Sequence, residues 1–139
     1  MAYELKIEQK ALYLHCIVTG RNTAENVTRY MQEVMQECAT RRCPRVLIEE
    51  RLEGPRLGTM EVFTLVSAGA KRFHGLLEAL AFVDVNADAG VMRFAEDVAV
   101  NRGIPVKVFR VVEGAEKWLL QHTRSAATAA EVTSPKPPG

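Results

Sequence analysis

Two periodicities alternate along the chain, one typical of strands and the other of helices. Residues 3–8 alternate between apolar and polar side chains, with Leu5 and Ile7 on one side, which predicts a half-exposed strand. Residues 11–19 continue as a second strand, and the short connection between the two favours an antiparallel pair. One face of the second strand is wholly apolar, formed by Leu12, Leu14, Cys16 and Val18.

Apolar residues at steps of three and four predict three helices further along the chain. The first helix follows Asn22, which we expect to cap it, and the second runs from about Thr59 to Phe73. The third follows Asn86 as a cap and ends at Gly103. The stripe of the second helix that should face the core consists of Val62, Phe63, Val66, Ala70 and Phe73.

Short apolar runs at residues 45–52, 79–85 and 106–111 predict three more strands, and residues 113–121 predict a last helix. The element order is then β-β-α-β-α-β-α-β-α. Because successive βαβ units need right-handed crossovers, this order predicts an α/β fold with a mostly parallel five-stranded sheet. The first strand should lie antiparallel at an edge, and helices should cover both faces.

Composition places this fold in one domain. The chain has 139 residues, 47% of them apolar, and residues 1–122 carry the whole pattern. Residues 123–139 are small, polar and rich in proline, so we expect a disordered tail. The net charge of +1, with both signs interspersed, argues against nucleic-acid binding. We expect a cytoplasmic protein, because the sequence shows no signal-peptide pattern, no apolar run long enough for a transmembrane segment, and only three cysteines.

The last strand and helix of the domain resemble a motif of a known protein family. Residues 105–119 resemble the closing motif of the SpoIIAA-like proteins, in which a strand ending in Phe109 leads into a short helix with Ala115 and then Trp118. The element order also resembles that of the STAS domain and its SEC14-like (CRAL-TRIO) relatives, over roughly residues 3–120.

This resemblance implies two kinds of function. Anti-anti-sigma factors of the family bind a kinase and are phosphorylated on a serine where the second helix opens. The matching stretch here, residues 54–61, has no such serine, and Thr59 is its only hydroxyl. SEC14-like relatives instead hold lipids, which implies a pocket between helices and sheet.

Several carboxylates lie near the ends of predicted strands, namely Glu49, Glu50, Glu53, Asp84 and Asp88. Ligands of parallel sheets bind beyond the carboxyl ends of the strands, and Glu49 or Glu50 could meet Asp84 if their strands are neighbours. The arginines nearby in the sequence favour ion pairs instead. His15 and Cys16 point to opposite faces of a strand, and the loop of residues 54–59 lacks the ending of a phosphate-binding loop. We therefore expect no enzyme activity, no cofactor and no metal site.

The second helix is apolar beyond one stripe, because Met60, Leu65 and Ala68 lie outside it and Leu57 precedes it. Deep packing, a partner surface and a lid over a ligand pocket all remain open. Our first hypothesis is a non-enzymatic protein-interaction or regulatory domain that binds a protein partner or a second copy as a homodimer. Its contacts would be Arg56, Leu57, Thr59, Met60 and Leu65. The alternative is a carrier of a lipid or other small apolar ligand, in a pocket lined by Phe63, Phe73, Met92 and Phe94.

Overall fold

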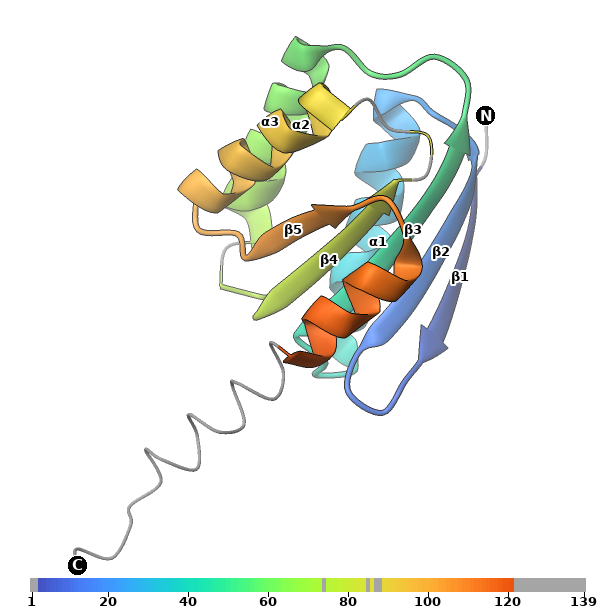
Figure 1. Ribbon diagram of the computed structural model, residues 1–139, viewed down its shortest axis with the longest axis vertical. Helices are drawn as coiled ribbons and strands as arrows, with labels where there is room; N and C mark the ends of the chain where they lie inside the picture. The colour runs from blue at the N-terminus through green and yellow to red at the C-terminus, as the bar shows by residue number, and fades with distance from the viewer. Residues whose placement is uncertain (1–2, 74, 85, 87–88, 122–139) are drawn as a thin grey trace, which may run out of the picture.

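The structure is a computed structural model, and it describes residues 3–73, 75–84, 86 and 89–121 (Figure 1). The chain runs through five strands and four helices in the described residues. They are β1 (Tyr3–Gln9), β2 (Leu14–Arg21), α1 (Ala24–Thr40), β3 (Arg45–Glu53), α2 (Thr59–Phe73), β4 (Ala79–Asp84), α3 (Ala89–Asn101), β5 (Val106–Phe109) and a C-terminal helix over residues 112–121.

The strands form one sheet in the order β1-β2-β3-β4-β5. β1 pairs antiparallel with β2 at one edge, and the other three pairings are parallel. Each parallel strand is reached through a helix, as right-handed crossovers require. The predicted α/β fold, its element order and its antiparallel edge strand are therefore confirmed.

Helices cover both faces of the sheet. α1 packs on one face, where its Tyr30 and Val34 join a core with Leu14 and Ile48 of the strands (Figure 1). The C-terminal helix packs on the other face, where Ala115 and Leu119 join a second core with Leu47, Ala79, Ala81 and Val83. α2 and α3 lie side by side beyond α1, and α3 packs on β5.

Two local predictions are wrong. Leu12 is 49% exposed and precedes β2, because residues 10–13 form a turn in which the Lys10 N–H donates to the Tyr13 carbonyl. Thr23, rather than Asn22, caps α1, since its Oγ1 accepts from the Asn26 N–H at 3.1 Å. Residues 87–88, between Asn86 and α3, lie outside the described residues, so the cap at Asn86 stays a prediction.

The end of α3 follows the prediction, since Gly103 has a φ of 85° and the Ile104 N–H donates to the Ala99 carbonyl. The predicted tail at residues 123–139 lies outside the described residues, so the domain boundary stays a prediction. Within the described ranges, no helix is long and apolar enough to cross a membrane.

Candidate ligand-binding site

Side chains on the face of the sheet that carries α1, α2 and α3 form rows across the strands. These rows change from apolar to acidic toward the carboxyl ends of the strands. The first two rows are apolar, Leu14–Val46–Leu80–Val106 and Cys16–Ile48–Phe82–Val108. In the third row Val18 lies beside Glu50, and Glu50 lies beside Asp84. The sheet therefore presents an apolar floor that ends in two neighbouring carboxyl groups.

α2 runs over this floor and leaves a cavity of about 270 Å³ beneath it. Leu80, Phe82, Val106 and Val108 form its floor, and Val91, Met92, Ala95, Glu96 and Ala99 of α3 form one wall. The Glu96 carboxylate in this wall accepts from the Val108 N–H at 2.7 Å. The α2 residues that line the cavity follow the helical repeat, as Val62, Leu65, Val66, Gly69, Ala70 and Phe73. The volume is close to the lower end of the range of roughly 300–1,000 Å³ for small-molecule sites.

The cavity opens between α1 and α2. Thr28 of α1 and Ala68 and Arg72 of α2 all line the cavity and are exposed. On α2 only Ala70 is fully buried, so the helix covers the cavity without closing into the sheet. A small molecule would have a route from solvent to the apolar floor.

A buried polar cluster closes the far end of the cavity, and it is formed by Tyr30, Glu50, Asp84 and Arg56 from four different segments. Glu50 is 4% exposed and Asp84 5% exposed, and both line the cavity. The Tyr30 hydroxyl donates to Glu50 Oε2, and the Glu50 and Asp84 carboxyl groups are hydrogen-bonded to each other. Asp84 Oδ1 also accepts from the Asn86 N–H at 2.9 Å.

Arg56 supplies the positive charge of this polar cluster from the loop between β3 and α2. Its Nη2 donates to the carbonyls of Leu52 at 2.9 Å and Gly54 at 3.0 Å, which fixes the loop against the end of β3. Its Nη1 lies 3.6 Å from Asp84 Oδ2, an ion pair. Asn22 holds the same loop, because its Nδ2 donates to the Pro55 carbonyl at 2.9 Å.

Burial sets the protonation of the polar cluster. Burial, together with the negative charge of Asp84, raises the pKa of Glu50 to about 8, although the Tyr30 hydrogen bond and the Arg56 charge act in the opposite direction. Burial and the neighbouring Glu50 also raise the pKa of Tyr30 well above its usual value. The raised pKa favours the protonated form of Glu50, next to the Tyr30 phenol and the ion pair between Asp84 and Arg56.

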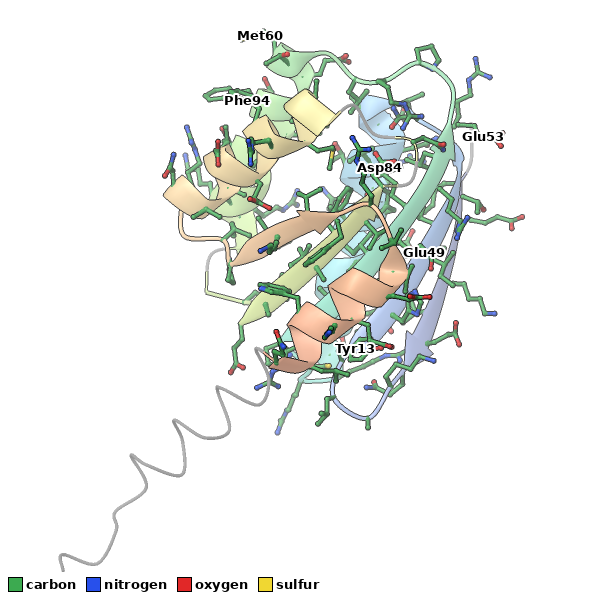
Figure 2. The ribbon with its side chains drawn as sticks, viewed as in Figure 1. Tyr13, Glu49, Glu53, Met60, Asp84 and Phe94 are labelled. Carbon is green, nitrogen blue, oxygen red and sulfur yellow. The ribbon has the colours of Figure 1, made fainter. Side chains whose placement is uncertain are left out.

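The other candidate carboxylates are elsewhere. Glu49 faces the C-terminal helix, where it contacts His15 Nε2 at 2.9 Å and pairs with Arg51, and Glu53 points outward at the end of β3 (Figure 2). Asp88 lies outside the described residues. The predicted meeting of strand-end carboxylates is therefore confirmed for Glu50 and Asp84. Among the residues that the structure describes, no three His, Cys, Asp or Glu side chains are grouped to hold a metal ion.

The five residues predicted to contact a partner divide into two sets. Arg56, Leu57 and Leu65 line the cavity. Thr59 and Met60 are exposed, with Met60 73% exposed at the outer end of α2, pointing away from the sheet (Figure 2). That these residues bind a partner stays a prediction.

The four residues predicted to line a ligand pocket also fall into two sets, one that lines the cavity and one that does not. Phe73 and Met92 line the cavity. Phe63 and Phe94 instead contact each other between α2 and α3, with ring centroids 6.4 Å apart, and Arg102 lies over the Phe63 ring at 5.1 Å. Tyr30 was not among the predicted site residues, because it lies in the buried, otherwise apolar stripe of α1. Its hydroxyl, in an otherwise apolar stripe, was the one available sign of a buried polar partner.

Comparison with known proteins extends the description of the fold. No protein-family model matches the chain, and no curated protein matches it. Among solved structures, it resembles an uncharacterised protein of the DUF3478 family with a SpoIIAA-like fold from Shewanella loihica PV-4. The TM-score is 0.53 at 15% sequence identity, over 85% of this chain and 94% of the other. The chain therefore has a SpoIIAA-like fold, as the closing motif and the element order predicted.

Proposed function

We propose that this domain binds a small, mainly apolar molecule in the cavity beneath α2 and acts as a carrier or sensor rather than as an enzyme. The observation that carries the proposal is the cavity itself, with an apolar floor, largely apolar walls and a polar cluster at one end. Sites for small molecules are commonly built in this way, as an apolar concavity with a few convergent polar groups.

The position of the cavity supports the same conclusion. The polar cluster lies at the carboxyl ends of β3 and β4, where ligands of parallel sheets bind. Its carboxyl groups have internal partners in Tyr30, Arg56 and the Asn86 N–H. Such partners favour a fixed recognition group over a carboxylate that exchanges protons with a substrate.

Filling the cavity tests this proposal. Gly69 lies on the cavity side of α2, and a Cβ atom added there would meet nothing within 4 Å. Gly69→Leu should place a side chain in the cavity, while Gly69→Ala is the matched control that adds one methyl group. Benzene is a suitable probe, because apolar cavities of this kind bind it.

We expect benzene to shift the amide NMR signals of Val66, Phe82 and Ala95 saturably in the wild type and in Gly69→Ala. Gly69→Leu should lose at least about tenfold in affinity. Native mass spectrometry of freshly purified protein should also show a bound small molecule that is absent from Gly69→Leu. If benzene causes no saturable shifts in the wild type, the cavity does not bind ligands and the proposal is wrong.

A second candidate function is protein interaction through the outer end of α2. It is favoured by the exposure of Met60 and by Phe63 three residues later on the same side of the helix. If a second copy binds there, light scattering after size exclusion should show a dimer in the wild type and a monomer in Met60→Glu. Leu65→Glu places its charge in the cavity instead and separates the two surfaces.

A further inference from the structure

The polar cluster leaves one strong hydrogen-bond donor without a partner. Arg56 Nη1 is buried and has no hydrogen-bond partner among the described residues. Its distance of 3.6 Å to Asp84 Oδ2 allows charge attraction but is too long for a hydrogen bond. An unmade hydrogen bond of a buried charged group is costly, so an acceptor placed beside this nitrogen would be stabilised.

The charges around this donor restrict what the acceptor can be. Glu50 from β3, Asp84 from β4, Tyr30 from α1 and Arg56 are the titratable side chains of the cluster, and Asn22 lines the same cavity. Arg56 and Asp84 compensate each other. A carboxylate head group would add an anion beside Asp84, and an ammonium would add a cation beside the Arg56 guanidinium. The carboxylate would be a buried charge without its own partner, and the ammonium would require Glu50 to lose the proton that burial favours. An uncharged oxygen avoids both costs.

The donor is within reach of a bound molecule. Nη1 itself is shielded from solvent, but the Arg56 side chain as a whole is 26% exposed and the residue lines the cavity. The other guanidinium nitrogen, Nη2, anchors the side chain on the Leu52 and Gly54 carbonyls. A molecule bound in the cavity would therefore lie against this side chain.

The space that remains sets the size of the ligand. At about 30 Å³ for each water-sized group, a cavity of 270 Å³ holds about nine such groups. Apart from the cluster, the floor is apolar, and so is the α3 wall except for Glu96, whose carboxylate accepts from the Val108 N–H at 2.7 Å. An unbranched or compact hydrocarbon body with one oxygen atom would therefore occupy the cavity and reach the donor.

We infer that the ligand of this cavity is a small uncharged amphiphile whose hydroxyl or carbonyl oxygen accepts a hydrogen bond from Arg56 Nη1, with an apolar body of about nine heavy atoms beneath α2. This inference rests on the proposed function, since it names the ligand class of the same cavity. It adds the identity and the position of the polar group that the ligand carries.

Five eight-carbon probes separate the head groups at nearly constant size: octane, octan-1-ol, octan-2-one, octanoate and octylammonium. Their affinities for the wild-type protein are measured at pH 7 by amide NMR titration. We expect octan-1-ol or octan-2-one to bind at least about tenfold more tightly than octane, octanoate or octylammonium. The order of the alcohol and the ketone shows which oxygen the site prefers.

Arg56→Met tests the donor directly. It keeps the apolar stem of the side chain, and we expect the preference for the alcohol or ketone over octane to fall at least about fivefold. Arg51→Met is the matched control, because Arg51 pairs with Glu49 on the opposite face of the sheet. The amide spectrum of each variant shows whether it is folded. If Arg56→Met does not fold, the ranking of the five probes in the wild type is the deciding result.

The results distinguish the two proposals. If octane binds as tightly as octan-1-ol, or if octanoate or octylammonium binds most tightly, the inference about the head group is wrong while cavity binding stands. If none of the five probes nor benzene binds, the proposed function itself is wrong. An unchanged alcohol preference in folded Arg56→Met also overturns the role of Arg56.

Discussion

α1 and α2 lie on the same face of the sheet and carry similar apolar stripes, yet they bury very different amounts of side chain. On α1 the residues Tyr30, Val34, Met35 and Cys38 are buried together with Asn26. On α2 only Ala70 is buried, although six of its residues point to the interior side. The stripe of α1 is filled by the sheet, whereas the stripe of α2 faces the cavity.

This difference shows that a helical repeat determines which side of a helix faces the interior but not how tightly that side is packed. α2 has its close backbone contacts with α3 and α1, among the described elements, rather than with a strand. Its inward side chains therefore lack the dispersion contacts that a filled core would give them. A bound apolar molecule would supply those contacts, which is why we assign the binding site to this helix.

The largest expected effect is a contrast in stability between the two helices. Val34 on α1 is fully buried outside the cavity, while Val66 on α2 is half-buried and lines it. We expect Val34→Ala to lower the free energy of unfolding by about 2–3 kcal/mol and Val66→Ala by less than about 1 kcal/mol. Urea denaturation of both variants measures the contrast, and equal losses would mean that α2 is packed as well as α1.

A smaller effect is the pH dependence of the free energy of unfolding, which we expect Glu50 to cause. Glu50 lies between Tyr30 of α1 and the loop that leads into α2. The folded pKa of Glu50 is about 8, against an ordinary value of 4.5, so unfolding releases a proton between these two pH values. Stability from this group is fully present below pH 4.5 and is lost as the pH rises through 8, by roughly 1.4 kcal/mol per pH unit.

Glu50→Gln should flatten this dependence, since the amide keeps the shape and cannot ionise. Denaturation at several pH values between 5 and 8 measures the slope for each protein. Glu53→Gln is the control, because Glu53 is exposed at the end of the same strand. A slope in Glu50→Gln equal to that of the wild type would show that Glu50 is already ionised in the folded protein.

The smallest effect is expected on α2 itself. Glycine inside a helix costs stability relative to alanine, and a Cβ atom at Gly69 would meet nothing within 4 Å. We expect Gly69→Ala to raise the free energy of unfolding by about 0.5–1 kcal/mol, measured as an upward shift of the midpoint in thermal melting. A loss of stability would indicate that the wall of the cavity is closer to α2 than the structure shows.

Most of the fold could be predicted from the sequence because each element carries a strong local pattern. The predicted range of the second helix, residues 59–73, matches α2, since an apolar repeat begins just after Gly58 and ends just before a glycine turn at Gly75. Leu12 shows the limit of such patterns. It continues the alternation of β2, but it lies in the turn that the hydrogen bond from the Lys10 N–H to the Tyr13 carbonyl closes, before the strand begins.

The site was less predictable because it depends on which residues become neighbours. Glu50 and Asp84 could be paired from the sequence only by assuming that β3 and β4 are adjacent. The side of α2 that faces the cavity includes Leu65, which the pattern assigned to a partner surface, and excludes Phe63, which it assigned to the core. Both depend on where α3 lies, since Phe63 contacts Phe94 there.

The most direct test of the cavity is to locate a bound probe by intermolecular nuclear Overhauser effects. With benzene in the wild-type protein, we expect contacts from benzene to the methyl groups of Val66 and Leu80, on opposite sides of the cavity. Leu119 in the core of the other sheet face should show none. Contacts confined to Met60 at the outer end of α2, or to no methyl group at all, would contradict a binding site beneath this helix.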